Sequence, residues 1–577
     1  MSSSRARAWV AGYCALLTLI IIGPLAGSGY LLLRDAVSTP RSYLTDSALG
    51  LGAAAPRAVP QDALLAVLSP VIDGGILVKA MLIVALWAAG YGAAVLVRRF
   101  LDAGVPAQLV AATIALWNPF VAERLLQGHW SLLAGYAALP WTALAAVRVR
   151  RALAPERLGA WTALAASFAA AGLTPTGSLL AAIIGLALVG RRALVPAIVL
   201  WLVSCAPWLT ATALGSGAEP SDPAGVAAFA ARAEPWLGTL GSLAGLGGIW
   251  NGEAVPASRT TPLALVATVL LLAVVVLGVR AVWTRGRDGR TLLVIAAAAI
   301  VLPALGATPW GLAVGEWLVV HVPGAGLLRD TQKYVALAMP AYALCAAAAC
   351  HRVAEWFGPR SRGHDENRTA RSDSQSTAGT SMVAALFIAL LVLPLADLAW
   401  GVGNEMRAVH YPGSWEQVAE KIDAPGDVAV LPGGMFRRFP YSGTAPVLDP
   451  APRILPNDVM QTGELRVRGY AVTGEGNRAR TVEEALLTGA PPTTLADLGV
   501  GWVLVEHTTP GPLGDSEKTL AATQLVHTDD NLSLYRIPDP TPRDIATPTQ
   551  RHLSTAAHLL WATLLVTALL TTALRRD

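Results

Sequence analysis

The chain is poor in charge. Only 14% of its 577 residues are Asp, Glu, Lys or Arg, whereas 54% are hydrophobic, and the mean hydropathy is +0.50. Soluble domains carry about 25% charged residues, so this composition excludes a water-soluble globular protein and predicts an integral membrane protein. The net charge is only +4, which gives no support to nucleic acid as a partner.

Cysteine and lysine are also scarce. The cysteines all fall within long apolar stretches: Cys14, Cys205, Cys345 and Cys350. A disulfide framework or a thiolate metal site is therefore not expected. Lysine occurs only at Lys79, Lys333, Lys421 and Lys518, which leaves 39 of the 43 basic residues as arginine. The bias toward arginine and alanine indicates a GC-rich genome.

About twelve apolar segments have roughly the length that a membrane-spanning helix needs, about 20 residues. Their approximate bounds are 9–33, 76–97, 106–122, 131–147, 159–173, 176–190, 193–214, 261–283, 291–306, 335–350, 382–400 and 553–574. The first has too long an apolar run for a signal peptide and no small-residue cleavage site, so it predicts an anchor. We therefore predict a mainly α-helical, polytopic bundle in residues 1–400, with a final helix and tail in residues 553–577.

The arginines between these segments set the predicted orientation. When the spans are threaded in order, the basic short loops fall on one side of the membrane, which is the cytoplasmic side for most membrane proteins. Both termini of this multi-pass cell-membrane protein are then cytoplasmic. The outer loops are 34–75, 123–130, 215–260, 307–334 and 401–552. The polar cytoplasmic stretch 358–380 is predicted to be a disordered linker.

The longest outer segment, 401–552, has the pattern of a small α/β domain. Residues 427–432 and 500–507 are apolar runs bounded by turn residues, which is typical of buried strands. Residues 414–422 and 480–487 are predicted helices. A long loop without secondary structure is the alternative, but such loops are uncommon at this length.

Three clusters of charged residues in the predicted outer loops are candidates for a functional site, because placing a charged side chain near the hydrocarbon costs about 3 kcal/mol. The first is Leu33-Arg34-Asp35, at the predicted end of the first span. Arg34 could hold the pKa of Asp35 down, and a carboxylate placed there could act as a general base toward a hydroxyl. The alternative is an Arg and an Asp that only mark the end of a helix.

The second cluster lies in NPFVAERLLQGHW, residues 118–130. The Asn-Pro pair disfavours helical geometry, and Glu123, Arg124, Gln127 and His129 follow it. An ordinary turn between two helices is the simpler interpretation. Such a turn needs only small polar residues, however, so an acid, a guanidinium and an imidazole together indicate a site.

The third cluster is GAGLLRDTQKY, residues 324–334. Arg329 and Lys333 are four residues apart and would share one face of a helix, with Asp330 and Gln332 between them. Both cations could therefore meet one phosphate. The alternative is attraction to anionic lipid headgroups, but that predicts the cytoplasmic face rather than the outer one.

Taken together, these motifs resemble the GT-C superfamily. The residues that carry the resemblance are the acidic first outer loop, Asn-Pro-x-x-x-Glu-Arg-x-x-x-Gly-His at 118–129, Leu-Pro-Trp at 139–141 and Arg-Asp-x-x-Lys-Tyr at 329–334. More narrowly, the chain is similar to polytopic glycosyltransferases of actinobacterial envelopes, including the membrane part of the large arabinofuranosyltransferases, and to YfhO-type proteins. It is too short to hold the long carbohydrate-binding extensions of those arabinofuranosyltransferases.

The resemblance implies transfer of a sugar, with inversion, from a polyprenyl-phosphate donor to a hydroxyl of an envelope glycan or glycolipid on the outer face. Asp35 would be the base, and Arg329, Lys333 and Arg124 would hold the donor phosphate. His129, Glu123, Asp330 and Gln332 would orient the acceptor, with Glu123 pairing with Arg124. Some relatives bind a divalent cation, but no metal-ligand spacing is present here, and no other cofactor is expected.

Two other functions remain open at this stage. A lipid or polysaccharide transporter is one, although its charges should be distributed through both leaflets and an inverted-repeat transporter should show matching halves. The second is a GT-C relative without catalysis that scaffolds envelope synthesis. The glycosyltransferase mechanism requires Asp35, Arg124, His129, Arg329 and Lys333 to converge on one outward-facing cavity.

Overall fold

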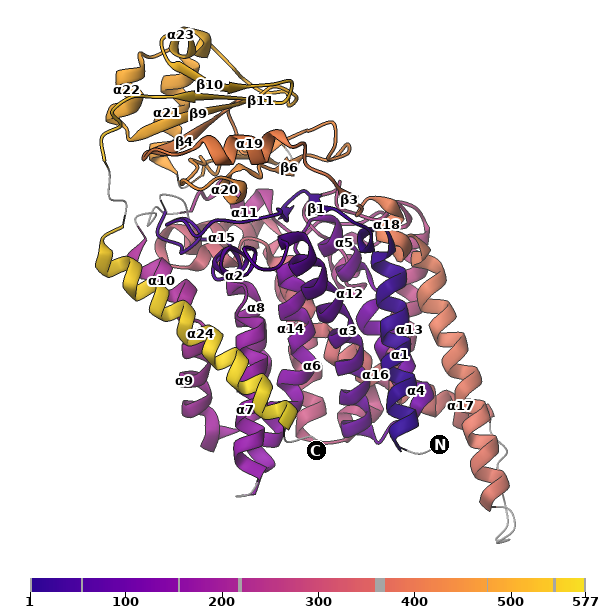
Figure 1. The fold of residues 1–577 in the computed structure, drawn as a ribbon. Coiled ribbons are helices and arrows are strands. Elements are labelled where there is room, and N and C mark those ends of the chain that lie inside the picture. The colour runs from indigo at the N-terminus through magenta and orange to yellow at the C-terminus, as the bar shows by residue number, and fades with distance from the viewer. Residues whose placement is uncertain are drawn as a thin grey trace.

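The long apolar helices form a bundle with the α/β domain across one end (Figure 1). The computed structural model describes residues 3–52, 56–153, 156–215, 221–357, 369–467, 469–474, 476–542 and 546–574. The start of α1 and the end of α24 lie at the end of the bundle opposite the α/β domain. The predicted fold class, a mainly helical membrane bundle with a small α/β domain, is confirmed.

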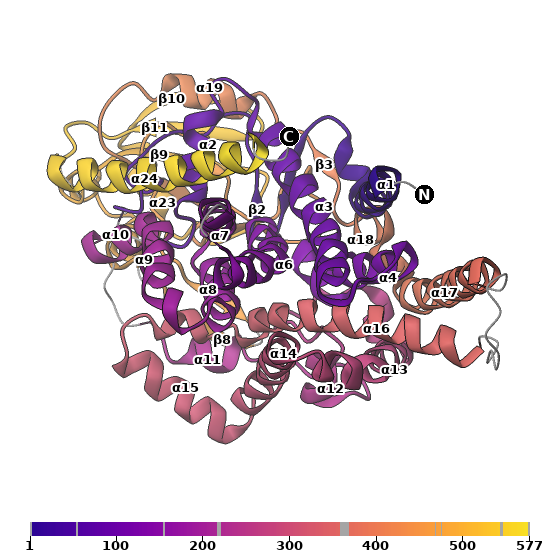
Figure 2. The ribbon, with the colours of Figure 1, turned by 90° about the horizontal axis from the view of Figure 1, so that it is seen from below.

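The bundle is built from helices of different lengths. They are α1 (Ser3–Ile22), α3 (Gly74–Leu101), α4 (Val105–Leu116), α5 (Pro119–Leu126), α6 (Trp130–Arg151), α7 (Arg157–Ala171), α8 (Pro175–Val189), α9 (Leu194–Ser204), α10 (Ala206–Leu214), α13 (Leu263–Thr284), α14 (Arg287–Gly306), α16 (Met339–Phe357), α17 (Thr369–Val392) and α24 (Pro548–Leu574). Viewed along the bundle, α6 and α8 lie near its centre, whereas α17 and the connecting helix α15 (Pro309–His321) lie at its edge (Figure 2).

Shorter helices lie in the connections. They are α2 (Gln61–Leu68), α11 (Ala224–Ala228), α12 (Gly238–Ala244), α15 (Pro309–His321) and α18 (Ala399–Asn404), with 3-10 turns η1 (Gly23–Ala26), η3 (Arg191–Ala193), η4 (Ala257–Thr260), η5 (Ala325–Leu328), η6 (Thr331–Ala338) and η8 (Leu393–Leu398). Several helices start at capping side chains that accept hydrogen bonds from the first turn, which stabilises their N-termini. These caps are Asp73, Asn118, Thr174 and Thr308.

Fewer helices meet the length and composition expected of a membrane span than the twelve segments that the sequence predicted. In the part of the chain that the structure describes, nine helical segments are long and apolar enough to cross a membrane, or ten if the bent pair α9 and α10 is one span. All twelve predicted segments contain helix, but α7 and α8 have only 15 residues each. At 1.5 Å per residue they extend about 22 Å, which is less than the hydrocarbon core of about 30 Å.

Two predicted boundaries also differ. The first span was predicted to run to residue 33, but α1 ends at Ile22, η1 follows, and residues 30–33 form a strand. The predicted linker 358–380 is helical in its second half, because α17 begins at Thr369. Residues 358–368 lie outside the described residues.

The α/β domain contains a four-stranded sheet in the order β10-β11-β9-β4. Strand β4 (Asp427–Leu431) is parallel to β9 (Val500–Glu506), and β9, β11 (Leu532–Arg536) and β10 (Gln524–Thr528) are antiparallel. Its helices are α19 (Ser414–Lys421), α20 (Ala451–Ile454), α21 (Asn477–Leu487), α22 (Pro492–Asp497) and α23 (Ser516–Ala521). Two small hairpins, β5 (Phe436–Arg437) with β6 (Val447–Leu448) and β7 (Leu465–Val467) with β8 (Tyr470–Val472), extend from the domain.

The loop that follows α1 and η1 packs into this domain rather than standing apart from it. Strand β1 (Tyr30–Leu33) pairs with β2 (Ala36–Val37) on one side and with β3 (Ala408–Val409) on the other. Leu32 and Val37 belong to the same hydrophobic core as Trp415, Trp502 and other residues of the domain. The α/β domain therefore fixes where the tip of the β1-β2 hairpin lies.

Candidate active site

A cavity of about 1650 Å³ lies between the ends of the helices and the α/β domain. Its lining comes from the hairpin turn 34–35, the α5-α6 turn 127–132, the loop 250–253, the segment 319–333 and the domain segments 433–438 and 462–467. Five of the predicted site residues line it: Asp35, His129, Arg329, Asp330 and Lys333. All three charged clusters therefore contribute to one cavity, although two of them are some 200 residues apart in sequence.

Asp35 lies in the two-residue turn of the β1-β2 hairpin. Its neighbour Arg34 has a positive φ of 47°, a conformation that is uncommon for a residue with a side chain. The Arg34 guanidinium is buried and donates to the carbonyl oxygens of Leu126 (2.7 Å) and Glu253 (2.6 Å). The Asp35 N–H donates to the Gln127 carbonyl oxygen at 3.1 Å. These bonds hold the hairpin tip against the end of α5.

Gly128 allows this close approach. It has a φ of 84°, and a Cβ added there would overlap the backbone of Ala36 and Leu33. We expect Gly128→Ala to destabilise the protein by about 1–3 kcal/mol through backbone strain alone, with further loss from the overlap. Gly324→Ala is the matched control, because Gly324 has a φ of 82° and nothing within 4 Å of the added Cβ. Thermal unfolding in detergent tests the difference, and equal melting temperatures would contradict this role of Gly128.

The Asp35 carboxylate is held by the α5-α6 turn. Its Oδ2 accepts hydrogen bonds from His129 Nε2 at 3.0 Å and from Gln127 Nε2 at 3.2 Å, and 34% of its side chain is exposed. Burial by itself would raise the pKa of Asp35, but the hydrogen bonds from His129 and Gln127 and the charge of Lys333 outweigh it and lower that pKa. Asp35 is therefore ionised at neutral pH. Arg34 was predicted to have this effect, but its guanidinium binds backbone carbonyls instead.

The tautomer of His129 follows from its partners. Arg124 Nη1 lies 3.0 Å from His129 Nδ1, and because a guanidinium can only donate, Nδ1 must accept. Nε2 then carries the proton that is donated to Asp35. Burial and the nearby cations Lys333 and Arg124 lower the pKa of His129, so the imidazole is neutral at neutral pH.

Arg124 was predicted to contact a donor phosphate directly, and the structure corrects this. Its side chain is fully buried behind the cavity wall. It donates to both carboxylate oxygens of Asp330, at 2.9 and 3.2 Å, and to Gln332 Oε1. A guanidinium held in this way orients the residues that face the cavity rather than meeting a ligand itself.

Glu123 and Gln332 also differ from their predicted roles. Glu123 was predicted to pair with Arg124, but it accepts hydrogen bonds from the N–H groups of Gly248 and Ile249 and from Gln332 Nε2, each at 3.1 Å. Both side chains are fully buried. They fix the loop that follows α12 against α5, so they support the wall and do not face an acceptor.

Arg329 and Lys333 line the cavity, but not on one helix as predicted. Helix η5 ends at Leu328, and Asp330 has a non-helical ψ of 78° before η6 begins at Thr331. The Lys333 ammonium lies 3.5 Å from Asp330 Oδ2, and 25% of its side chain is exposed. The Arg329 guanidinium lies over the Phe229 ring, 5.7 Å from its centroid.

Asp330 is shared between Lys333 and the buried Arg124. Burial by itself would raise the pKa of Asp330, but the charges of Arg124 and Lys333 outweigh it and hold that pKa far below its usual range. Asp330 therefore stays ionised and neutralises one cation. Lys333 and Arg329 both line the cavity, and two cationic side chains on one lining suit an anionic ligand.

Another part of the cavity wall is apolar. Trp208 and Ala211 from α10 and Val319, Val320 and Val322 from the end of α15 line it. The outward face of α15 is apolar as well, and Trp310 is 85% exposed. Exposed tryptophans are typical of helices that lie in a membrane interface. The cavity thus combines a charged wall with an apolar wall that continues to the membrane-facing surface, which suits an amphiphilic ligand.

Among the described residues, no group of three or more His, Cys, Asp or Glu side chains could hold a metal ion. The sequence did not single out several lining residues, including Trp250, Asn251, Arg438, Glu464 and Glu483. Asn251 donates to Gln127 Oε1 at 2.8 Å. In the sequence, the polar Trp-Asn-Gly turn at 250–252 could have indicated Asn251.

Comparisons with known proteins show a structural likeness but no sequence match. No protein-family model matches the sequence, and no curated protein matches it. Among solved structures, the fold is similar to the crystal structure of ArnT from Cupriavidus metallidurans bound to undecaprenyl phosphate. The TM-score is 0.42 and the sequence identity 13%, over 94% of this chain and 99% of that chain.

Proposed function

We propose that the chain is a membrane glycosyltransferase of the GT-C type that transfers a sugar from a polyprenyl-phosphate donor to a hydroxyl of an envelope glycan or glycolipid. One observation carries the proposal. An ionised carboxylate, Asp35, and two cations, Arg329 and Lys333, line a single cavity that also has an apolar wall. A base, an anion site and a lipid-compatible surface are the three parts that this reaction needs.

The reaction follows from these three parts. The acceptor oxygen attacks the anomeric carbon, and its proton passes to the Asp35 carboxylate. The bond between the anomeric carbon and the phosphate oxygen breaks, and its electrons go to the departing polyprenyl phosphate. Arg329 and Lys333 stabilise the charge that develops there, which is usually a large contribution to catalysis. A single displacement of this kind inverts the configuration at the anomeric carbon.

The proposed orientation places the cavity on the outer face. Basic residues lie at the helix ends away from the α/β domain, such as Arg98 and Arg99 at the end of α3 and Arg148, Arg150 and Arg151 at the end of α6. By the positive-inside rule those ends are cytoplasmic. Both termini are then cytoplasmic and the α/β domain is outside, where its polar lining residues would meet an acceptor glycan of an actinobacterial type of envelope.

Comparison of strains tests the proposal most directly. The envelope lipids and glycans of a deletion strain are compared with those of strains that carry the wild type or Asp35→Asn. We expect the wild type alone to restore the missing glycosidic linkage. Restoration by Asp35→Asn would indicate a scaffold. Failure of purified wild-type protein to form a glycosidic bond from polyprenyl-phosphate sugars, with lipid transport intact in vesicles, would indicate a transporter.

A further inference from the structure

A continuous chain of charged and hydrogen-bonded side chains joins the two halves of the cavity. Lys333 lies 3.5 Å from Asp330, and Asp330 lies 2.9 Å from Arg124. Arg124 lies 3.0 Å from His129, and His129 lies 3.0 Å from Asp35. The cation proposed for the donor phosphate is thereby linked to the proposed base through Asp330, Arg124 and His129.

The chain has only one consistent direction of hydrogen bonding. Asp330 accepts from Arg124, Arg124 donates to His129 Nδ1, and His129 Nε2 donates to Asp35. If His129 carried its proton on Nδ1 instead, two donors would face each other and Asp35 would lose the hydrogen bond from His129. Arg124 therefore prevents the second tautomer, and Asp330 fixes Arg124 through two hydrogen bonds.

The two oxygens of Asp35 are not equivalent. In the described structure, both side-chain hydrogen bonds to the carboxylate, from His129 and from Gln127, end on Oδ2. Oδ1 is then the oxygen with lone pairs that remain available to a hydroxyl. Since 34% of the side chain is exposed, an acceptor can reach it from the cavity.

We propose that His129 is the positioning residue of Asp35: Arg124 and Asp330 lock it in the tautomer with the proton on Nε2, and it turns Oδ1 of Asp35 toward the acceptor hydroxyl. The inference rests on the proposed function, because it takes Asp35 as the base.

The pH profile separates positioning from a general structural role. Asp35 is faced by His129 and Gln127 from the α5-α6 turn and by Lys333 from η6, and Arg34 precedes it in the hairpin. The His129 hydrogen bond lowers the pKa of Asp35. Its removal raises that pKa, so the acid limb of the kcat/KM profile moves to higher pH.

Two substitutions at His129 form the test, with sugar transfer measured from a short-chain polyprenyl-phosphate sugar. In His129→Asn the side-chain oxygen can still accept from Arg124 near the Nδ1 position, but no donor reaches Asp35. We expect kcat to fall about 10- to 100-fold, as for a misplaced catalytic group, with the donor KM within about 2-fold and the acid limb at higher pH. In His129→Gln the amide nitrogen reaches the Nε2 position, so most of kcat and the original acid limb return.

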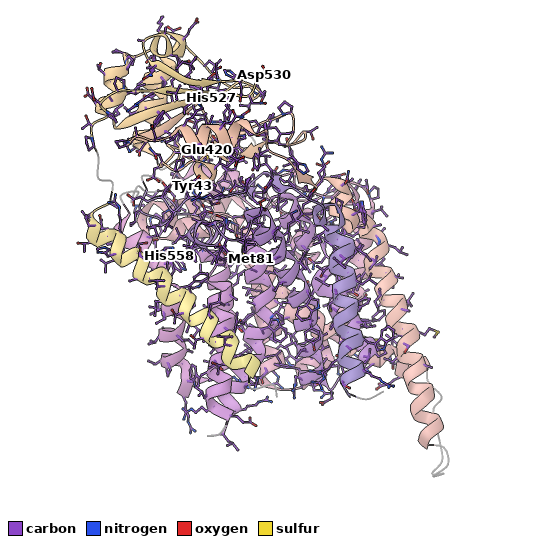
Figure 3. The ribbon with its side chains drawn as sticks, viewed as in Figure 1. Tyr43, Met81, Glu420, His527, Asp530 and His558 are labelled. Carbon is purple, nitrogen blue, oxygen red and sulfur yellow. The ribbon has the colours of Figure 1, made fainter. Side chains whose placement is uncertain are left out.

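The control is His527→Asn, in another His–Asp pair that lies on the α/β domain away from the bundle (Figure 3). It should leave both kcat and the pH profile unchanged. An unchanged acid limb in a folded His129→Asn protein would overturn the inference. If His129→Asn does not fold, His129→Gln alone tests the inference. An acid limb that moves to higher pH in His129→Gln would show that the amide does not replace the His129 hydrogen bond, and this would contradict the inference. Absence of transfer by the wild type would instead refute the proposed function.

Discussion

Asp35→Asn is expected to lower kcat for sugar transfer by about 100- to 10,000-fold, the range over which a general base contributes. The substitution keeps the shape of the side chain and an oxygen that can accept from His129, so the hairpin tip should hold its place. It removes the lone pair that takes the acceptor proton. Steady-state kinetics in detergent or proteoliposomes, with the melting temperature measured in parallel, provide the readout.

Asp102→Asn is a suitable control for this experiment. Asp102 follows α3 at the opposite end of the bundle, and its side chain is 92% exposed. Its weak contact with Arg285, at 3.9 Å, should contribute little to stability. Near-normal transfer by Asp35→Asn, with a normal amount of folded protein, would remove Asp35 as the base.

Lys333→Met is expected to lower kcat/KM for the polyprenyl-phosphate donor by about 10- to 100-fold. A hydrogen bond to a charged group contributes about 1.5–3 kcal/mol, and 1.4 kcal/mol corresponds to a factor of ten. Asp330 keeps its two bonds to Arg124, so the substitution does not leave a buried carboxylate without a partner. The acceptor KM should change much less, and this separates loss of phosphate binding from general damage.

Two further variants sharpen the Lys333 experiment. Lys333→Arg keeps the charge but changes its geometry, so it should recover part of the lost donor affinity. Lys518→Met removes an exposed lysine that pairs with Asp515 on the α/β domain, and it should behave as the wild type. Unchanged donor kinetics in Lys333→Met would contradict the phosphate assignment.

The sequence predicted which segments meet at the cavity because charge is conspicuous in an apolar chain. Asp35, His129 and Lys333 were selected on that basis, and the structure places them on one lining. It could not predict the partner of each charge. Arg124 was paired with its neighbour Glu123, whereas its carboxylate is Asp330, which lies 206 positions further along the chain. Pairings between residues so far apart in the sequence are decided by tertiary packing, and the spacing of neighbouring residues does not predict them.

The local sequence pattern also gave a wrong prediction where the same apolar residues suit either a helix or a strand. The residues Tyr-Leu-Leu-Leu at 30–33 continue an apolar run and were included in the first span, but they form β1. The strand exists because β3 and β2 supply its hydrogen bonds. Similarly, Arg329 and Lys333 satisfy helical spacing, but the backbone between them is not helical at Asp330, whose carboxylate accepts from Arg124.

The pairing of the hairpin with the α/β domain has a consequence for biosynthesis. Arg34 forms a bridge with Val447, and the Leu448 N–H donates to the Arg34 carbonyl oxygen. Ribosomes add about 5–20 residues per second, so the hairpin waits roughly 20–80 s for these partners to be made. Until then Asp35 is held by its contacts with the end of α5. Under the proposed function, we expect a nascent or truncated chain to transfer sugar poorly even when its helices are inserted, and full activity to appear once the α/β domain has folded onto the hairpin.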